Sequence, residues 1–267
     1  MTVLIARVLF LRMAQVQVAH LSKSFQAENN HKQPATVIHD MNFTIAEGEF
    51  ISIFGPNGSG KSTLLSLIAG LEKPDSGAIH IMTPQGEHIQ PKIGFVFQNY
   101  NESMLPWRTV RGNVELALEQ TMSSPSERKA TAMNLLEKVG LAHVAERYFY
   151  DLSGGMKQLV AICRAFAYEP DVLLLDEPFS ALDFATTRKV EMDLLSVWSE
   201  KKKTALCISH DVDDAVFLAD KVMVLSPRPA HIKGIIPIDL PRPRTMAMFT
   251  SPEFFALRSQ VLELFSI

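Results

Sequence analysis

The segment from Gly55 to Ser62, GPNGSGKS, constrains the fold more than any other part of the chain, because it matches the pattern G-x-x-x-x-G-K-[ST]. The apolar run Phe50–Phe54 before it is typical of a strand, and residues 61–71 after it are typical of a helix that ends at Gly70. A glycine-rich turn between a strand and a helix N-terminus directs backbone N–H groups and the positive end of the helix dipole at a phosphate. A plain glycine-rich turn capped by serine is the structural alternative.

The residue types of this loop indicate separate roles in nucleotide binding. We expect Lys61 to reach the β- and γ-phosphates, and we expect the hydroxyl of Ser62 to ligate Mg²⁺. The residues expected to surround the nucleotide phosphates are Gly55, Pro56, Asn57, Gly58, Ser59, Gly60, Lys61, Ser62 and Thr63.

Two adjacent carboxylates, Asp176 and Glu177, follow the apolar residues 172–175. Such a run is typical of a strand buried on both faces, and acids directly after it cost free energy unless they bind something. Successive side chains of a strand point to opposite faces, so the two acids should have different roles. We expect Asp176 to hold the metal through water and Glu177 to polarise the attacking water. Capping of the next segment is the structural alternative.

The order of the predicted elements gives the fold class. Strand-like segments, the first of them an edge strand at residues 16–25, lead into a helical region over residues 99–168. Strands then alternate with helices again, and a last helix begins near Ser251. This order predicts an α/β fold with a mainly parallel sheet and a helical insertion.

A second candidate anion site, LSGG, lies upstream of the carboxylates. Ser153, Gly154 and Gly155 open a predicted helix, whose N-terminus favours anions. A phosphate loop and a second such site, each present once, predict that the two serve different copies of the molecule.

LSGG, VLLLDEP, SALD and SHD, in this order, resemble the ATPase cassette of ABC transporters over about residues 14–240. The resemblance implies a P-loop NTPase-type, mainly parallel sheet with an antiparallel β subdomain and a helical insertion subdomain. It also implies a homodimer in which LSGG of one subunit closes on ATP bound by the other. The implied divisions are an N-terminal extension (1–13), an ATPase core (14–98 and 169–245), a helical signature subdomain (99–168) and a C-terminal helix (246–267).

The resemblance also assigns roles to single residues. Phe25 matches the aromatic that stacks on adenine, although core packing is its alternative. Gln98 matches the glutamine that contacts Mg²⁺ and couples to the membrane subunit. Asp183 matches the acid that passes signals across the dimer interface, and His210 matches the histidine at the γ-phosphate.

The implied activity is ATP hydrolysis with ATP and Mg²⁺ as cofactors. Its catalytic residues would be Lys61, Gln98, Glu177 and His210, and its metal site would involve Ser62, Gln98 and Asp176. At three positions, Met156, Leu159 and Cys163, the residue differs from the one that is usual in the family. None of these positions is one that contacts phosphate.

Two further segments are similar to those of the nitrate/sulfonate/taurine importer group: MLPWRTV at residues 104–110 and SPEFFALRSQVLELF at residues 251–265. This similarity implies import of such a solute, or of a thiamine or pyrimidine precursor, through a separate permease with a solute-binding protein. Core packing is the alternative for Trp107. The rival functions are an exporter cassette, which the LPW segment disfavours, and a soluble non-transport ABC ATPase, which the single cassette without a CxxC pair or basic arm disfavours.

Composition limits the surroundings in which the chain works. A net charge of −3 gives no electrostatic reason to expect a nucleic-acid partner. Cys163 and Cys207 lie in apolar surroundings, which predicts buried free thiols in a reducing compartment. No apolar stretch reaches the roughly 18–20 residues that span a bilayer. We therefore expect a peripheral protein at the cytoplasmic face of the inner (plasma) membrane. Residues 1–13 are apolar but lack the N-terminal charge and the small-residue cleavage site of a signal peptide, so we expect a disordered or peripheral extension, with Met13 as an alternative start.

Overall fold

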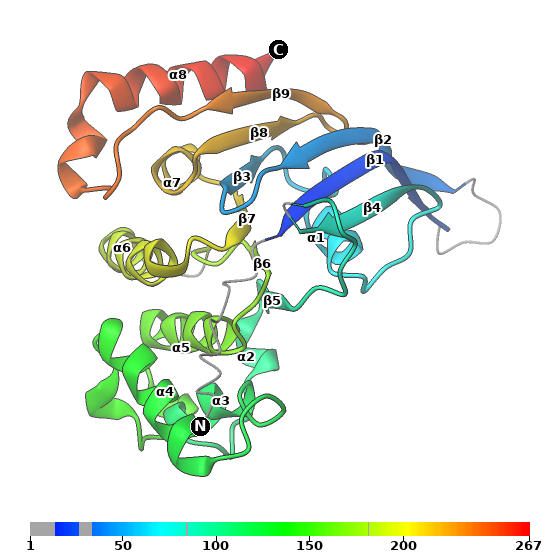
Figure 1. Ribbon diagram of the computed structural model, residues 1–267. Helices are drawn as coiled ribbons and strands as arrows, with labels where there is room; N and C mark the ends of the chain where they lie inside the picture. The colour runs from blue at the N-terminus through cyan, green and yellow to red at the C-terminus, as the bar shows by residue number, and fades with distance from the viewer. Residues whose placement is uncertain (1–13, 27–33, 84, 181) are drawn as a thin grey trace, which may run out of the picture.

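The computed structural model describes residues 14–26, 34–83, 85–180 and 182–267. Its centre is a six-stranded sheet with the strand order β5-β6-β7-β3-β8-β9 (Figure 1). All neighbours in it pair parallel except β8 and β9, so the predicted mainly parallel sheet is confirmed. The strands are β3 (Phe50–Phe54), β5 (Ile93–Val96), β6 (Val172–Asp176), β7 (Thr204–Ser209), β8 (Lys221–Leu225) and β9 (Ile232–Pro237).

A second, antiparallel sheet has the order β2-β1-β4 and lies to one side of the first, next to α1 (Figure 1). Its strands are β1 (Gln15–Phe25), β2 (Ala35–Ile45) and β4 (Ser76–Met82). The prediction of an edge strand at residues 16–25 was wrong, because β1 pairs with β2 on one side and with β4 on the other. The second partner comes from beyond the phosphate loop, so the local alternation of β1 could not reveal it.

The helical insertion forms a layer of its own below the sheets (Figure 1). Its helices are α2 (Tyr100–Ser103), α3 (Val110–Leu116), α4 (Pro125–Lys138) and α5 (Gly154–Ala167). Helix α4 begins after Ser124, because the Ser124 side chain accepts a hydrogen bond from the backbone N–H of Glu127. Beyond its end, Gly140 takes the left-handed backbone conformation that favours glycine, with φ of 71°.

The described residues also form the α-helices α1 (Lys61–Ile68), α6 (Phe184–Lys201), α7 (Val212–Leu218) and α8 (Pro252–Ser266). Helix α8 contacts β8, β9 and α7 and lies along the far edge of the large sheet (Figure 1). The core includes Trp198 of α6, whose ring packs edge-on against Phe50 at 5.4 Å between ring centroids. In the described part of the chain, no helix is long and apolar enough to cross a membrane.

Cys163 and Cys207 are free and buried, as predicted.

Local patterns set most of the element boundaries. Helix α1 ends at Ile68, two residues before the predicted end at Gly70, and Gly70 has a φ of 72°. The antiparallel strand β9 was not predicted, because its residues are mostly half-exposed and it ends in a proline.

Candidate functional site

A cavity of about 310 Å³ lies over the phosphate loop. It is lined by Asn57, Gly58, Gly60, Lys61, Ser62, Thr63, Gln98, Glu177 and Arg228. Parallel pairing explains how residues so distant in sequence meet, because β5, β6 and β7 are neighbours that all run the same way. Gln98, Glu177 and His210 each come just after the carboxyl end of one of these strands, where parallel α/β sheets place their ligands.

The loop itself needs glycine at the position before its lysine. Gly60 has a φ of 112°, which side chains rarely adopt, and a Cβ there would lie 2.7 Å from Cγ1 of Val37. The antiparallel sheet therefore packs directly against the phosphate loop. A larger residue at this position would displace the backbone whose N–H groups face the cavity.

Lys61 is buried, with 5% of its surface exposed. Its Nζ donates hydrogen bonds to the carbonyl oxygens of Gly55 and Pro56, both at 3.0 Å. Burial lowers the pKa of Lys61, while the negative charges of Glu177 and Asp176 act in the opposite direction. A phosphate in the cavity would act in the same direction as these carboxylates and would hold the ammonium group charged.

Ser62 and Asp176 place two oxygen ligands side by side, because the Ser62 hydroxyl donates to Oδ1 of Asp176 at 3.1 Å. Burial, joined by the charge of Glu177, raises the pKa of Asp176, although the hydrogen bond from Ser62 opposes the shift. A hydroxyl and a carboxylate are hard oxygen ligands of the kind that Mg²⁺ takes together with nucleotide phosphates. The described residues contain no group of three or more His, Cys, Asp or Glu side chains that could hold a metal ion unaided. The hydroxyl of Ser62 and the carboxylate of Asp176 fit a Mg²⁺ that would bind together with the nucleotide.

Glu177 stands between Gln98 and His210. Its Oε2 accepts a hydrogen bond from Nε2 of Gln98 at 3.1 Å and lies 3.9 Å from Nδ1 of His210. The backbone of Glu177 is left-handed, with φ of 45°, which is costly for a residue other than glycine. This backbone holds the carboxylate at the cavity wall, where it can accept a proton from a water molecule between it and a phosphate.

Arg228 also lines the cavity, although the sequence did not predict it. This residue lies in the turn between β8 and β9, and the turn is fixed to the antiparallel sheet because the N–H of Ala230 donates to the carbonyl of Val37 at 2.8 Å. Arg228 thereby brings a positive charge to the wall of the phosphate cavity. The sequence carries no signal for this, since the short turn SPRP follows no nucleotide-binding pattern.

Comparison with known proteins identifies the family. The family described as "ABC transporter" matches residues 38–180, which is more than half of the chain. The chain belongs to the ABC transporter ATPase family. It is 42% identical to a nitrate import ATP-binding protein, NrtD, of Synechococcus elongatus, over 86% of this chain and 85% of that protein. It is 41% identical to a bicarbonate transport ATP-binding protein, CmpC, of Synechocystis, over 92% of this chain but 37% of that longer protein.

Solved structures show the same relationship. A dimeric bacterial ABC transporter cassette, MJ0796, superposes with a TM-score of 0.71 and is 30% identical, over 84% of this chain and 99% of that chain. The chain is therefore an ABC transporter ATPase that binds ATP, in a family whose cassettes dimerise and work with permeases.

The signature residues of this cassette lie outside the phosphate cavity. Ser153 begins α5, where its side chain accepts a hydrogen bond from the N–H of Met156 at 3.5 Å. Asp183 begins α6 and accepts from the N–H and the hydroxyl of Thr186. Gly155 packs the two helices together, because a Cβ there would meet Cγ2 of Thr186 at 2.4 Å. None of Ser153, Gly154, Gly155 and Asp183 lines the cavity.

Phe25 is also absent from the cavity lining. Its side chain is 39% exposed, and the ammonium group of Lys23 lies 5.0 Å from the centre of its ring. The core-packing alternative is therefore wrong for Phe25. Its exposed ring leaves stacking on adenine as a proposal.

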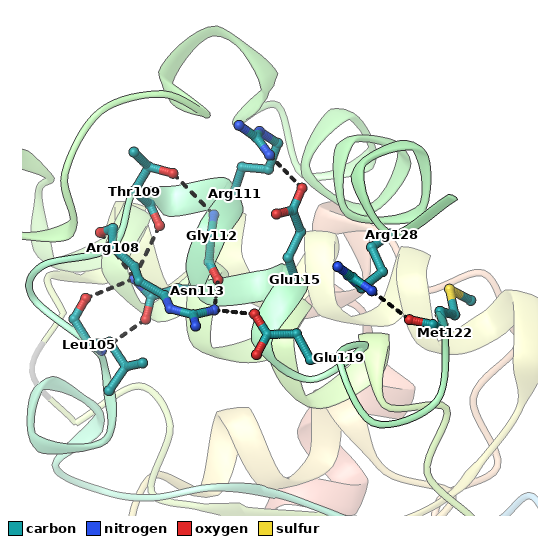
Figure 2. Close-up of polar contacts among 10 residues, drawn as sticks. All are labelled: Leu105, Arg108, Thr109, Arg111, Gly112, Asn113, Glu115, Glu119, Met122 and Arg128. Atoms are coloured by element: carbon teal, nitrogen blue, oxygen red, sulfur yellow. Dashed lines mark hydrogen bonds and ion pairs between the residues drawn. The ribbon is translucent and has the colours of Figure 1, made fainter. Parts of the chain in front are cut away.

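The LPW segment presents Trp107 at the surface of the cassette. This side chain is 70% exposed, so the alternative of core packing is wrong for it as well. The fully buried Asn113 of α3 holds together the turn that contains Trp107, through contacts with Leu105, Arg108 and Thr109 (Figure 2). Its amide exchanges two hydrogen bonds with the backbone of Leu105 and donates to the carbonyl oxygens of Arg108 and Thr109. One buried side chain therefore fixes the backbone on either side of Trp107.

Proposed function

We propose that this ATPase powers the import of a small solute of the nitrate or bicarbonate kind through a separate membrane permease. The observation that carries the proposal is that the phosphate loop, Gln98 and Glu177 line the same cavity, with Asp176 and His210 beside it. The choice of cargo is supported by the names of the nitrate and bicarbonate relatives. The LPW segment is similar to that of the nitrate/sulfonate/taurine importer group. Members of this group also carry sulfonates, taurine and thiamine or pyrimidine precursors.

The cavity residues suggest a division of work during hydrolysis. Lys61 neutralises charge on the β- and γ-phosphates, and His210 contacts the γ-phosphate. Glu177 orients the attacking water, and the hydrogen bond from Gln98 holds the carboxylate in place. Ser62, Gln98 and, through water, Asp176 would hold a Mg²⁺, which would supply further neutralisation of the phosphate charge.

A second copy of the chain would complete the site. Ser153, Gly154, Gly155 and Asp183 lie outside the cavity of their own subunit, and they would close on ATP held by a partner. Ser153 and the N-terminus of α5 would then face the γ-phosphate, and Phe25 would stack on the adenine of its own subunit. ATP would thus bind the two subunits together, and hydrolysis would let them separate.

The permease would contact the surface that carries Gln98 and Trp107. Gln98 is exposed at the carboxyl end of β5, and Trp107 projects from the turn that Asn113 fixes. Closure of the dimer would move this surface and with it the membrane subunit. The cassette would then lie at the cytoplasmic face of the inner membrane, with a solute-binding protein on the other side and no nucleic-acid partner.

Replacement of Glu177 by Gln tests the catalytic assignment. The amide keeps the size of the side chain but cannot accept a proton, so steady-state ATPase activity should fall at least 100-fold while ATP binding persists. ATP should also trap the variant as a dimer in gel filtration. The exposed Glu87→Gln is the matched control and should leave turnover unchanged. Normal turnover in Glu177→Gln would show that another group acts as the base.

The transport role is tested in membranes. Tagged protein should copurify from mild-detergent extracts with a multi-spanning permease, and proteoliposomes of the complex should accumulate nitrate or bicarbonate only with ATP. Copurification with ribosomes or DNA instead would refute the transport role and leave only the ATPase.

A further inference from the structure

A second cavity, of about 290 Å³, lies between helix α6 and the segment that follows β9. It is lined by Met192, Leu195, Ser196, Ser199, Arg242, Pro243 and Arg244. None of these residues lines the phosphate cavity. The site therefore has no part in the proposed nucleotide chemistry, and its lining contains two guanidinium groups.

Arg244 is the unusual residue of this cavity, because it is a cation with only 3% of its surface exposed. Its Nη2 donates to the carbonyl of Ala219 at 2.6 Å, and Nη1 donates to that of Pro241 at a long 3.4 Å. Its Nε has no partner, and none of the ion pairs in the described residues includes Arg244. Burial, with a smaller effect of Arg242, lowers the pKa of Arg244 to about 10, so the group is still charged at neutral pH.

Arg242, in contrast, is already neutralised. Its Nε donates to Oδ1 of Asp220 at 2.9 Å, and its Nη2 lies 2.8 Å from the same oxygen. The guanidinium group also lies over the ring of Trp198, 4.5 Å from the ring centre. The two arginines and Asp220 thus leave one positive charge beside the cavity without a counter-charge. A ligand with a single negative charge would balance it, and charge-assisted hydrogen bonds to a guanidinium group are stronger than neutral ones.

The remaining walls indicate what else the ligand contains. Met192, Leu195 and Pro243 contribute apolar surface, while Ser196 and Ser199 are exposed. A water molecule takes about 30 Å³ of liquid, so the cavity has room for more than a bare ion. A carboxylate with a short apolar chain matches a buried cation next to apolar walls better than an inorganic anion, whose hydration the apolar walls could not replace.

We propose that this cavity is a binding site for a small organic monocarboxylate, with its carboxylate at Arg244 and its apolar chain against Met192, Leu195 and Pro243. The ligand would contact α6, which begins after Asp183, and a segment that Arg244 ties to Ala219 at the end of α7. Because α7 begins after Asp211, next to His210, the ligand would join two helices that both begin near the nucleotide site. The site does not depend on the identity of the transported solute.

The test uses butanoate as the probe on the full chain, with saturation-transfer NMR and the unfolding temperature as readouts. Butanoate should bind and raise the unfolding temperature, whereas the neutral butanamide should do neither. Butanamide cannot form the charge pair with Arg244. If that pair contributes about 1.4 kcal/mol to binding, the affinity for butanamide should be tenfold weaker than that for butanoate. Equal responses to butanoate and butanamide, or no butanoate binding in the millimolar range, would overturn the proposal. Equal binding of butanoate, nitrate and sulfate would overturn it too, as a general salt effect only.

A matched pair of variants locates the site without removing the buried arginine. Ser196→Glu places a carboxylate at the exposed edge of the cavity, where it should compete for Arg244 and weaken butanoate binding at least tenfold. Ser196→Gln has nearly the same size but no charge, and it should bind butanoate like the wild type. Because position 196 is exposed, both variants should fold. Butanoate binding by Ser196→Glu as tight as that of the wild type would place the probe elsewhere and refute the assignment.

Discussion

Replacement of Arg188 by Met should destabilise the cassette by about 3–5 kcal/mol, since it breaks a buried ion-pair cluster. Arg188 lies on α6, where its Nη1 lies 2.6 Å from Oε2 of Glu191. Its Nη2 lies 3.0 Å from Oδ1 of Asp214 on α7. The exposed fractions of these residues are 4%, 0% and 4%, so water cannot take the place of the lost cation.

The pH dependence of stability gives a second signature of this cluster. Burial, joined by the charge of Asp214, raises the pKa of Glu191 above its ordinary value of 4.5. Above about pH 4.5 the unfolded chain releases this proton, while the folded chain keeps it until the pH passes the raised pKa. Stability should therefore fall as pH rises through this window, by up to about 1.4 kcal/mol per pH unit. Glu191→Gln, which cannot ionise, should flatten this slope.

Thermal and urea unfolding measure both effects. For a chain of this size, a loss of 3–5 kcal/mol corresponds to a fall in unfolding temperature of roughly 6–20 °C. The exposed Arg147→Met is the matched control and should change stability by less than about 0.5 kcal/mol. If Arg188→Met is no less stable than this control, or if Glu191→Gln keeps the wild-type pH slope, the cluster does not stabilise the fold in this way.

Four further outcomes follow from single contacts. Gly155→Ala should cost about 1–3 kcal/mol in unfolding experiments, because its Cβ would meet the Thr186 methyl group, and Thr186→Ser should restore most of the loss. Asn113→Asp replaces an amide donor that faces three carbonyl oxygens, so it should lower the free energy of unfolding by roughly 1–3 kcal/mol, and a neutral result would contradict the contacts in Figure 2. Arg228→Ala should raise the Kd for ATP roughly 2–10-fold in fluorescence titrations, and an unchanged Kd would remove this residue from the site. Alkylation at pH 8 should modify neither cysteine until the chain unfolds, because burial raises the pKa of both thiols, that of Cys163 to about 12.

The parts of the site that sequence could predict are those fixed by local order. The phosphate loop joins a strand to the helix that follows it, so its residues are placed by a few consecutive backbone conformations. Glu177 follows the apolar strand β6, and its neighbours Gln98 and His210 follow β5 and β7. Once these strands are predicted to be parallel neighbours, their carboxyl ends must meet at one edge.

Residues placed by non-local pairing could not be predicted in this way. Arg228 reaches the cavity because the turn that contains it is tied to Val37 by a backbone hydrogen bond from Ala230. Val37 lies in the antiparallel sheet, whereas Ala230 lies in the turn between two strands of the large sheet, and nothing in the turn sequence records the contact. The central position of β1 has the same cause, since its second partner β4 follows the phosphate loop.

The buried cluster shows why even a local pair can mislead. Arg188 and Glu191 are three residues apart on α6, the spacing at which oppositely charged residues form ordinary pairs on solvated helix surfaces. Here α7 covers that face and adds Asp214, so the same spacing yields a buried cation between two acids. Sequence spacing specifies that two side chains meet, whereas their energetic effect depends on whether another element excludes water from them. For this cassette, the exclusion of water turns the loss of one partner from a cost of a few tenths of a kcal/mol into a cost of about 3–5 kcal/mol.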